Sequence, residues 1–281
     1  MLNVLVTGSK GFLGKHICEE LEKRDIEVIE YDIIDGNDIC NIDNLISHIS
    51  PCDYVIHTAA QADIDESYHH PSKTMQINVV GTTKCLEASS FCFKNYRLKK
   101  FIFASSVYVG GNKGSFYKVS KKVCEELCHE MYQSKWLPYV NIRYGSLYGP
   151  GANYWNRIND ICEKLLDKKE YEYNGSPDEK REYIHVQDAA KTTVDIMLNN
   201  NFDNKNVLVT GNESKTVKEL FDLFTEILGY DIVVKYKSND TRYTHYKTTP
   251  YAFDNNKVIR LNMSEYTELA NGLIQCLENV K

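Results

Sequence analysis

Three residues carry side chains that could together move a proton to or from an alcohol. Ser106 ends an apolar run, and Tyr117 and Lys121 follow on a segment with helical periodicity. Their i, i+4 spacing directs Tyr117 and Lys121 from one face of that helix. A tyrosine has an ordinary pKa of about 10, too high for a base at neutral pH, and a nearby ammonium would favour the phenolate. The serine hydroxyl could hold the same substrate oxygen. We predict a Ser-Tyr-Lys catalytic group; the alternative is an inert Y-x-x-x-K on an exposed helix.

The start of the chain predicts a partner for that chemistry. Residues 2–6 are apolar except for Asn3 and include the β-branched Val4 and Val6, and residues 8–14 (GSKGFLG) lead into a helical pattern. Strand, glycine turn and helix in this order are typical of a dinucleotide-binding unit. Gly8 would permit the tight turn, Gly11 the close approach of a pyrophosphate, and Gly14 the close packing of helix on strand. The helix N-terminus would offer free N–H groups and its positive dipole end to the phosphates.

The second strand supports this interpretation and bears on which dinucleotide binds. Residues 26–32 read as a strand that ends in Asp32, eighteen residues after Gly14. A carboxylate at that place holds an adenosine ribose and repels a 2′-phosphate, which favours NAD. Lys10, inside the glycine turn, resembles the basic residue of dinucleotide-binding proteins that use NADP, so NADP stays the alternative. The cofactor would take or give a hydride while the protein moves the proton. Structural glycines in an ordinary βαβ unit are the competing interpretation.

Strands and helices alternate regularly through the first half of the chain. Apolar runs at residues 54–58, 101–104 and 138–143 read as further buried strands, residues 43–49, 72–89 and 117–133 as helices, and Asp38-Ile39 as the end of a third strand. This alternation predicts an α/β fold, a Rossmann-like doubly wound parallel sheet, over residues 1–150. Residues 151–281 are less regular and are expected to form mainly a smaller C-terminal substrate-binding α/β lobe, with 184–200 returning to the first domain.

Composition excludes several other classes of function. The 281 residues carry a net charge of -6, whereas a nucleic-acid-binding protein presents a basic face. No apolar run approaches the length of a membrane span, and the first strand begins at the N-terminus with no signal peptide before it. Nine scattered cysteines fit a reducing compartment. We therefore expect a cytoplasmic protein that binds a small molecule, with no nucleic-acid or membrane partner.

Two groups of residues could suggest a metal but do not favour one. Cys124, Cys128 and His129 lie close together on one predicted helix, without a C-x-x-C motif or an evident fourth ligand. His69 and His70 lie in a predicted surface loop with no constellation of carboxylates. Helix packing and solvent exposure account for these residues, and no metal site is expected.

Further motifs give the chain a family resemblance. They are T-G-x-x-G-x-x-G at Thr7–Gly14, H-x-A-A at His57–Ala60, Asn78 before Val79–Thr82, the pair Ser105-Ser106, Y-x-x-x-K at Tyr117–Lys121, Y-G-P-G at Tyr148–Gly151 and R-[DE]-[YF]-I-H-V at Arg181–Val186. The chain resembles, over nearly its whole length, the extended short-chain dehydrogenases/reductases, in the NAD-dependent epimerase/dehydratase group that modifies nucleotide sugars. The resemblance implies a homodimer formed through the helix that carries Tyr117.

The resemblance also implies roles for individual residues. The glycines would hold the pyrophosphate, Asp38 and Ile39 would lie by the adenine, and Lys121 would also bind the nicotinamide ribose. The full expected cofactor-binding set is Gly8, Lys10, Gly11, Phe12, Leu13, Gly14, Asp32, Asp38, Ile39, Ala59, Ala60, Gln61, Ala104, Tyr117, Lys121 and Tyr144. The expected substrate-binding set is Ser106, Ser146, Arg181 and Arg242. In that set Arg181 would meet the substrate diphosphate, unless it is an ordinary surface arginine, and Arg242 is a weaker second anchor.

Three departures from the family pattern shape the functional expectation. The stretch between Ser106 and Tyr117 lacks the acidic, proline-containing insertion of relatives. Val107 and Tyr108 stand where 4,6-dehydratases carry an Asp-Glu pair, and Ser146 stands where many relatives carry asparagine. We expect a nucleotide-sugar 4-epimerase. The alternatives are a 4-ketoreductase or 4-dehydrogenase with exchangeable cofactor and, from another class, a non-catalytic cofactor-sensing protein.

Overall fold

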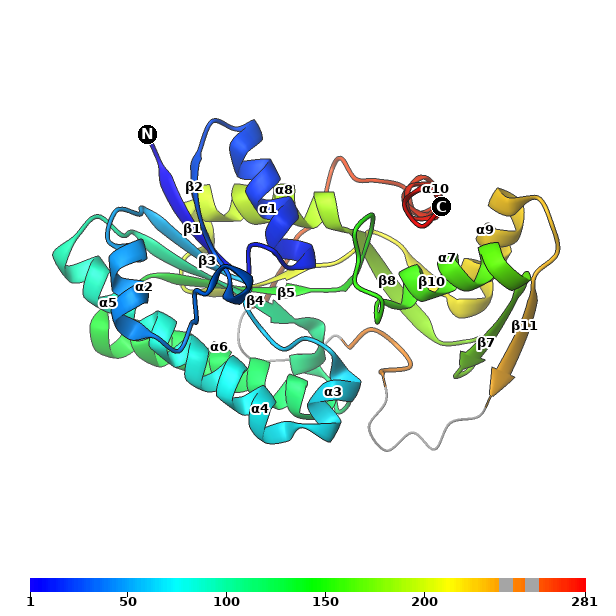
Figure 1. Ribbon diagram of the computed structural model, residues 1–281, viewed down its shortest axis with the longest axis horizontal. Coiled ribbons are helices and arrows are strands. Elements are labelled where there is room, and N and C mark those ends of the chain that lie inside the picture. Colours follow the sequence, from blue (N-terminus) through cyan, green and yellow to red (C-terminus); the bar gives the residue numbers. More distant parts are fainter. Residues whose placement is uncertain (238–244, 251–257) are drawn as a thin grey trace.

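The structure, a computed structural model, describes residues 1–237, 245–250 and 258–281. A large sheet covered by helices forms one lobe, and a smaller lobe extends from it (Figure 1). Within the described residues, no helix is both long and apolar enough to span a membrane.

Within residues 1–237, 245–250 and 258–281 the large sheet has seven strands, and every pair of neighbours is parallel. In sheet order they are β12 (Val258–Arg260), β9 (Lys205–Val209), β5 (Tyr139–Tyr144), β4 (Lys100–Ser106), β3 (Tyr54–His57), β1 (Asn3–Thr7) and β2 (Glu27–Tyr31). The carboxyl ends of β1, β3 and β4 lie along one edge, because Thr7 pairs with His57 and His57 with Phe103. The predicted Rossmann-like sheet is confirmed, and β9 and β12 join it from beyond residue 200.

Helices cover both faces of this sheet, which explains why its strands read as continuous apolar runs. On one face lie α1 (Phe12–Lys23) and α8 (Val186–Leu198); on the other lie α2 (Ile42–Ile49), α5 (Thr82–Asn95) and α6 (Ser115–Lys135). Along β1 the side chains alternate, so that Val4 and Val6 pack in the first core and Leu5 in the second. The large sheet is therefore the middle layer between two layers of helices.

Two predicted elements differ in the structure. No strand ends at Asp38 and Ile39; they lie in a turn that the Asp38 carboxylate closes by accepting the Cys40 N–H. The helix predicted over residues 72–89 is divided into α4 (Pro71–Met75), a π-helical turn (Gln76–Gly81) and α5, after a short α3 (Ile64–His69). Asn78 lies in the π-helical turn, a local widening that is frequent at functional sites.

The smaller lobe has its own core between short sheets and three helices. The sheets are β6–β8–β10 (Ser146–Tyr148, Lys180–His185, Ser214–Thr216) and β7–β11 (Glu170–Asn174, Val233–Lys237); the helices are α7 (Arg157–Lys168), α9 (Val217–Leu228) and α10 (Leu269–Asn279). Short helical turns at Ile33–Asp35, Val107–Gly110 and Asn200–Phe202 complete the described elements. Strand β6 follows β5 almost directly, so the small lobe begins beside the edge where the strands of the large sheet end.

Candidate active site

The glycine turn between β1 and α1 forms a cradle of exposed backbone. Gly8 has a φ of 69° and donates its N–H to the Tyr31 carbonyl at 2.8 Å. A Cβ on Gly8 would lie 2.7 Å from the Ala59 nitrogen, and a Cβ on Gly14 would lie 2.0 Å from the Gly8 carbonyl oxygen. Gly11 caps α1 without a side-chain hydrogen bond, which leaves the first helical N–H groups available. The cradle therefore fits a dinucleotide pyrophosphate, the group that such N-termini bind.

Acidic side chains surround the place expected for the adenosine ribose. The buried Asp32 carboxylate accepts the Lys10 N–H and the Ile34 N–H, both at 3.0 Å. Its neighbours Ile33 and Ile34 are 67% and 75% exposed, an apolar surface that sequence reasoning did not assign. Their exposure beside Asp32 is the signal that they could contact an adenine. The Asp38 side chain is exposed nearby. Asp32 and Asp38 both stay predicted cofactor contacts.

The segment after β3 is fixed from beneath by polar side chains. Asn78 accepts the Gln61 N–H at 2.7 Å and donates to the Gln61 carbonyl at 3.0 Å, and so fixes the backbone of Gln61. His57 is fully buried between the hydroxyls of Thr7 and Thr82. These contacts hold Ala59, Ala60 and Gln61 half-buried beside the glycine turn, where a cofactor could lie against their backbone.

Ser106, Tyr117 and Lys121 are brought together at the carboxyl end of β4. The Ser106 side chain lies beside the Tyr117 phenol, where it opposes part of the rise that burial causes in the pKa of Tyr117. Lys121 donates to the Ala104 carbonyl at 2.7 Å, and its Nζ lies 5.8 Å from the centre of the Tyr117 ring. Ser67 of α3, which sequence reasoning missed, accepts the Tyr117 N–H at 3.2 Å and so holds the first turn of α6.

The structure indicates the charge state of the group in the protein without a cofactor. Burial raises the pKa of Tyr117 to about 12, although the Ser106 side chain opposes the rise, and burial lowers the pKa of Lys121 to about 8. Desolvation of the phenolate therefore dominates in the protein alone, and the expected help from the ammonium stays a prediction. At pH 7 the group holds a neutral phenol beside a largely protonated lysine.

We expect Lys121→Met to be more stable than the parent protein at neutral pH. Between pH 8 and 10.5 the unfolded chain binds more protons than the folded one, so stability rises with pH across that window. Below pH 8 the burial penalty on the charged lysine acts in full, and its removal should raise the free energy of unfolding by about 2 kcal/mol. Urea unfolding at pH 7.0 and 9.5 measures this, and the gain should shrink at the higher pH. Lys122→Met, at an exposed neighbour, is the control; a less stable Lys121→Met at pH 7.0 contradicts the prediction.

A buried ion pair joins the three elements that carry the site. Glu125, one turn after Lys121, accepts hydrogen bonds from Arg143 of β5 at 2.9 and 2.6 Å and from the Ser105 hydroxyl of β4 at 2.5 Å. All three side chains are buried. Because Ser105 adjoins Ser106 and Glu125 shares a helix with Tyr117, this network fixes the position of α6 along β4. Only the fold revealed it.

Glu125→Gln should destabilise the protein by about 3 kcal/mol. The amide keeps the size of the side chain but removes the negative charge that faces a buried guanidinium, and breaking a buried pair from one side is costly. The matched control is Glu126→Gln, an exposed neighbour on the same helix, which should change stability by less than about 0.5 kcal/mol. Urea unfolding of both variants measures the difference; equal stabilities mean that the pair contributes no net stability.

The expected substrate residues meet around one tyrosine. Ser146 hydrogen-bonds the Tyr246 hydroxyl at 2.9 Å. Arg181 is buried, donates to the Tyr246 carbonyl, stacks 4.5 Å from its ring and pairs with Glu179 at 3.0 Å. Tyr108 bridges this group to the catalytic one, since its ring lies 4.8 Å from that of Tyr246 and 6.2 Å from that of Tyr117. Tyr108 and Tyr246 were not predicted as site residues.

Two other predicted residues do not join this arrangement. The Tyr144 hydroxyl bonds Thr193 of α8 at 2.6 Å in the core beneath the sheet, because alternate side chains of β5 face opposite sides. Any cofactor contact of Tyr144 would therefore not use its hydroxyl. Arg242 lies outside the described residues.

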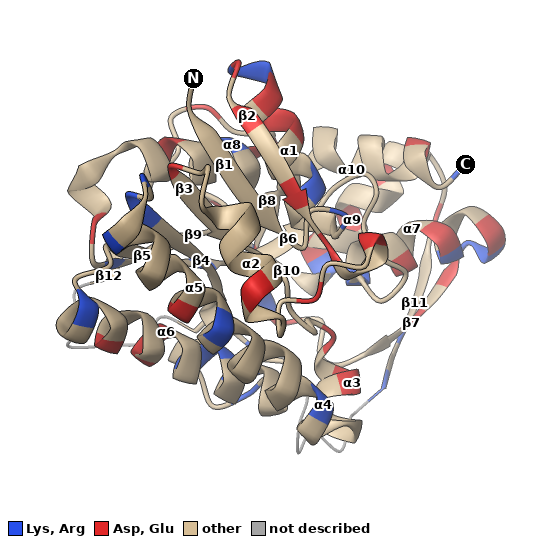
Figure 2. Ribbon diagram, turned by 60° about the vertical axis from the view of Figure 1, so that its left-hand side comes forward, with Lys and Arg blue, Asp and Glu red and all other residues tan. Residues whose placement is uncertain are grey.

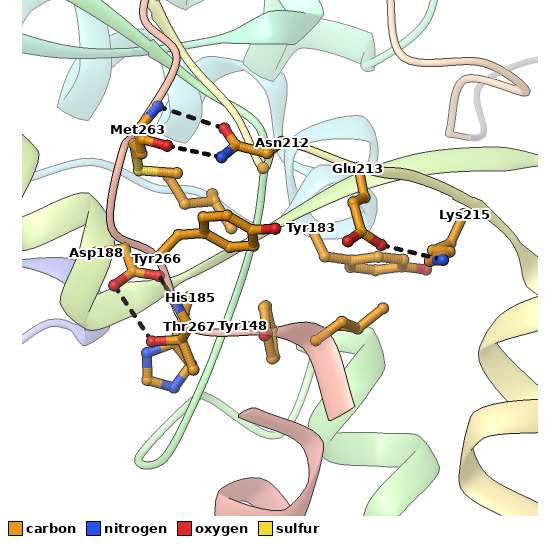
Figure 3. Close-up of a pocket in the computed structure, with 13 residues that line it drawn as sticks. Tyr148, Tyr183, His185, Asp188, Asn212, Glu213, Lys215, Met263, Tyr266 and Thr267 are labelled. Atoms are coloured by element: carbon orange, nitrogen blue, oxygen red, sulfur yellow. Dashed lines mark hydrogen bonds and ion pairs between the residues drawn. The ribbon is translucent and has the colours of Figure 1, made fainter. Parts of the chain in front are cut away.

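A hollow lies in the small lobe between β8 and the chain that leads into α10 (Figure 3). Asp188 accepts the Thr267 N–H at 2.7 Å, Asn212 donates to the Met263 carbonyl at 2.8 Å, and Glu213 pairs with Lys215 at 3.0 Å. These polar groups therefore have hydrogen-bond or ion-pair partners within the hollow. Among the described residues that line the hollow, none belongs to the Ser106 group. The hollow therefore lies where the start of α8 meets the chain before α10, apart from the catalytic side chains.

The residues weighed as metal ligands have other contacts. The Cys124 thiol donates to the Asn78 carbonyl, Cys128 is buried, and His129 contacts the Tyr139 hydroxyl at 3.3 Å. No group of three or more histidine, cysteine or acidic side chains with the arrangement of a metal site occurs in the described parts of the chain.

The sheet, the glycine cradle and the Ser-Tyr-Lys group define a dinucleotide-dependent oxidoreductase of the short-chain type. The chain belongs to the NAD dependent epimerase/dehydratase family, whose model matches residues 4–211.

Similar proteins have been named as sugar epimerases. The chain is 26% identical to a putative UDP-glucose 4-epimerase of Methanocaldococcus jannaschii, over 81% of this chain and 83% of that protein. Its fold matches UDP-glucose 4-epimerase from Thermotoga maritima, crystallised with UDP-glucose (TM-score 0.82, 24% identity, 99% and 98% of the two chains). It also matches UDP-glucuronic acid 4-epimerase from Bacillus cereus, in complex with UDP-glucuronic acid and NAD (TM-score 0.83, 22% identity, 99% of both chains).

Proposed function

We propose that the protein is an NAD-dependent 4-epimerase of a nucleotide-activated sugar. The observation that carries the proposal is the grouping of Ser106 beside Tyr117, with Lys121 one turn along the helix, at the sheet edge that also holds the glycine cradle. The catalytic roles follow from the side chains. The Tyr117 oxygen takes the proton of the sugar C4 hydroxyl, the Ser106 hydroxyl holds the same oxygen, and Lys121 supplies positive charge.

Bound NAD would supply the hydride acceptor, and its oxidised ring would add a positive charge to the site. The protein needs that charge, because burial keeps Tyr117 a neutral phenol and Lys121 alone does not offset it. Proton removal by Tyr117 is therefore expected only in the loaded enzyme. This coupling protects the site from acting as a base before the cofactor is in place.

Positions in the small lobe support a nucleotide sugar as substrate. In this proposal Arg181 holds the diphosphate, which would replace Glu179 as its counter-charge, and Ser146 contacts the sugar. Tyr108, in place of an acid pair, offers no carboxylate to remove water, so the proposal is an epimerisation and not a 4,6-dehydration. The relatives named as UDP-sugar epimerases make UDP-sugars the first substrates to assay.

Two further properties belong to the same proposal. Phe116, Val119 and Val123 form an exposed apolar stripe along α6, which supports a homodimer through that helix. All nine cysteines are free thiols, which supports a cytoplasmic location.

The test begins with the purified protein and no added cofactor. The protein is denatured, and the released nucleotide is identified and quantified by mass spectrometry. About one NAD per chain supports an epimerase, which regenerates its cofactor in every cycle. The protein is then given UDP-, GDP- and CDP-sugars, and 4-epimers are resolved by chromatography. An empty site with turnover only on added NAD or NADH instead indicates the 4-dehydrogenase or 4-ketoreductase, and nucleotide binding without turnover of any sugar indicates a sensor.

A further inference from the structure

The side chain of Lys10 is held by acidic residues of β2 and of the turn after it. Its Nζ lies 2.8 Å from Glu30 Oε2 and 3.9 Å from Asp35 Oδ2. The hydrogen bond to Glu30 raises the pKa of Lys10, and the same bond lowers the pKa of Glu30. Both groups are therefore ionised at neutral pH. Acidic positions, red in Figure 2, recur along β2.

The backbone of Lys10 places this ion pair at the ribose position. Its N–H donates to Asp32 Oδ2 at 3.0 Å, so the backbone of Lys10 contacts the carboxylate that is expected to hold the adenosine ribose. A cation at that place could bind a 2′-phosphate, as arginines and lysines do in NADP enzymes. In this structure the cation is matched by Glu30 and Asp35, and with Asp32 the three carboxylates give the region a net negative charge.

We propose that Glu30 selects NAD over NADP by pairing with Lys10, so that the lysine charge is matched and not offered to a 2′-phosphate. The proposal rests on the proposed function, because it assumes that a nicotinamide dinucleotide occupies the glycine cradle. It assigns discrimination to Glu30 of β2, two positions before Asp32, which directly follows the strand. The effect is of moderate size, since the side chains of Lys10 and Glu30 are 39% and 40% exposed and water screens such pairs.

The experiment measures which nucleotide the whole protein retains. Parent protein and variants are equilibrated with equal concentrations of NAD and NADP and separated from free nucleotide by gel filtration. Both nucleotides are then quantified by mass spectrometry. Glu30→Gln should raise the retained NADP-to-NAD ratio at least fivefold. Glu27→Gln, which removes an exposed charge from the far end of β2, should leave it within twofold of the parent.

The double variant Glu30→Gln/Lys10→Ala separates two explanations. If Glu30 acts by holding Lys10, the double variant should return to within twofold of the parent ratio, because the released cation is gone. If the double variant keeps the whole increase, Glu30 acts only through its own charge and the proposal is overturned. An unchanged ratio in Glu30→Gln overturns it as well. A parent protein that retains neither nucleotide overturns the proposed function itself, a result distinct from retention of NAD without any response to Glu30.

Discussion

Tyr117→Phe is expected to lower kcat at least about 100-fold, and toward 10,000-fold where proton transfer limits turnover. The phenyl ring keeps the packing against Tyr108 but loses the phenol hydroxyl that lies beside Ser106. Without it no side chain of the Ser-Tyr-Lys group can take the C4 proton, because Ser106 is a much weaker acid and Lys121 is a largely protonated cation below pH 8. The measurement is the rate of sugar epimerisation at saturating substrate.

The same variant should retain its nucleotide and its fold. Tyr117 is one of many expected cofactor contacts and lies outside the glycine cradle, so the NAD released on denaturation should stay close to the parent amount. Loss of one hydrogen bond should cost about 1 kcal/mol in the free energy of unfolding. Tyr132→Phe, at the other end of α6, is the matched control and should keep full activity. Turnover of Tyr117→Phe within threefold of the parent would remove Tyr117 from the mechanism.

Features set by neighbouring residues were predictable from the sequence. The glycine turn, the alternation of strands and helices, and the i, i+4 pair of Tyr117 and Lys121 all depend on spacings within a few residues, and the structure contains each of them. Even so, the helix around Asn78 was predicted as continuous, because a π-helical turn keeps an apolar pattern close to that of an α-helix.

Features that depend on distant contacts or on burial were not predictable. Ser67 holds the Tyr117 N–H across 50 residues, and nothing in its local pattern marks it. Tyr246 joins Ser146 to Arg181 only because β6 and β8 are neighbours in the small lobe. The rise in the pKa of Tyr117 was not predictable from the sequence, since desolvation depends on everything packed around the ring. Sequence identified the chemical groups, and tertiary packing determined their charge states.

Gly14→Ala is expected to destabilise the protein, although replacing glycine by alanine in a helix usually stabilises it. In an ordinary helix, alanine in place of glycine stabilises by about 0.5–1 kcal/mol. Here the new Cβ would lie 2.0 Å from the Gly8 carbonyl oxygen and 2.8 Å from its carbon, both backbone atoms that no side-chain rotation can move. The start of α1 must therefore shift away from β1, and the free energy of unfolding should fall by about 3 kcal/mol. Urea unfolding measures the sign as well as the size of the change.

Gly11→Ala, in the same turn, separates folding from cofactor binding. Its Cβ would lie 3.1 Å from the Gly8 carbonyl oxygen, a contact that a shift of a few tenths of an ångström relieves, and its φ of -74° suits alanine. The fold should therefore survive with a loss of less than about 1 kcal/mol. The added methyl group would nevertheless occupy the surface on which a pyrophosphate lies, so retained NAD should fall at least tenfold. If Gly14→Ala were as stable as Gly11→Ala, helix and strand would not be as closely packed as the structure has them. If Gly11→Ala kept its full NAD content, the pyrophosphate would not rest on this turn.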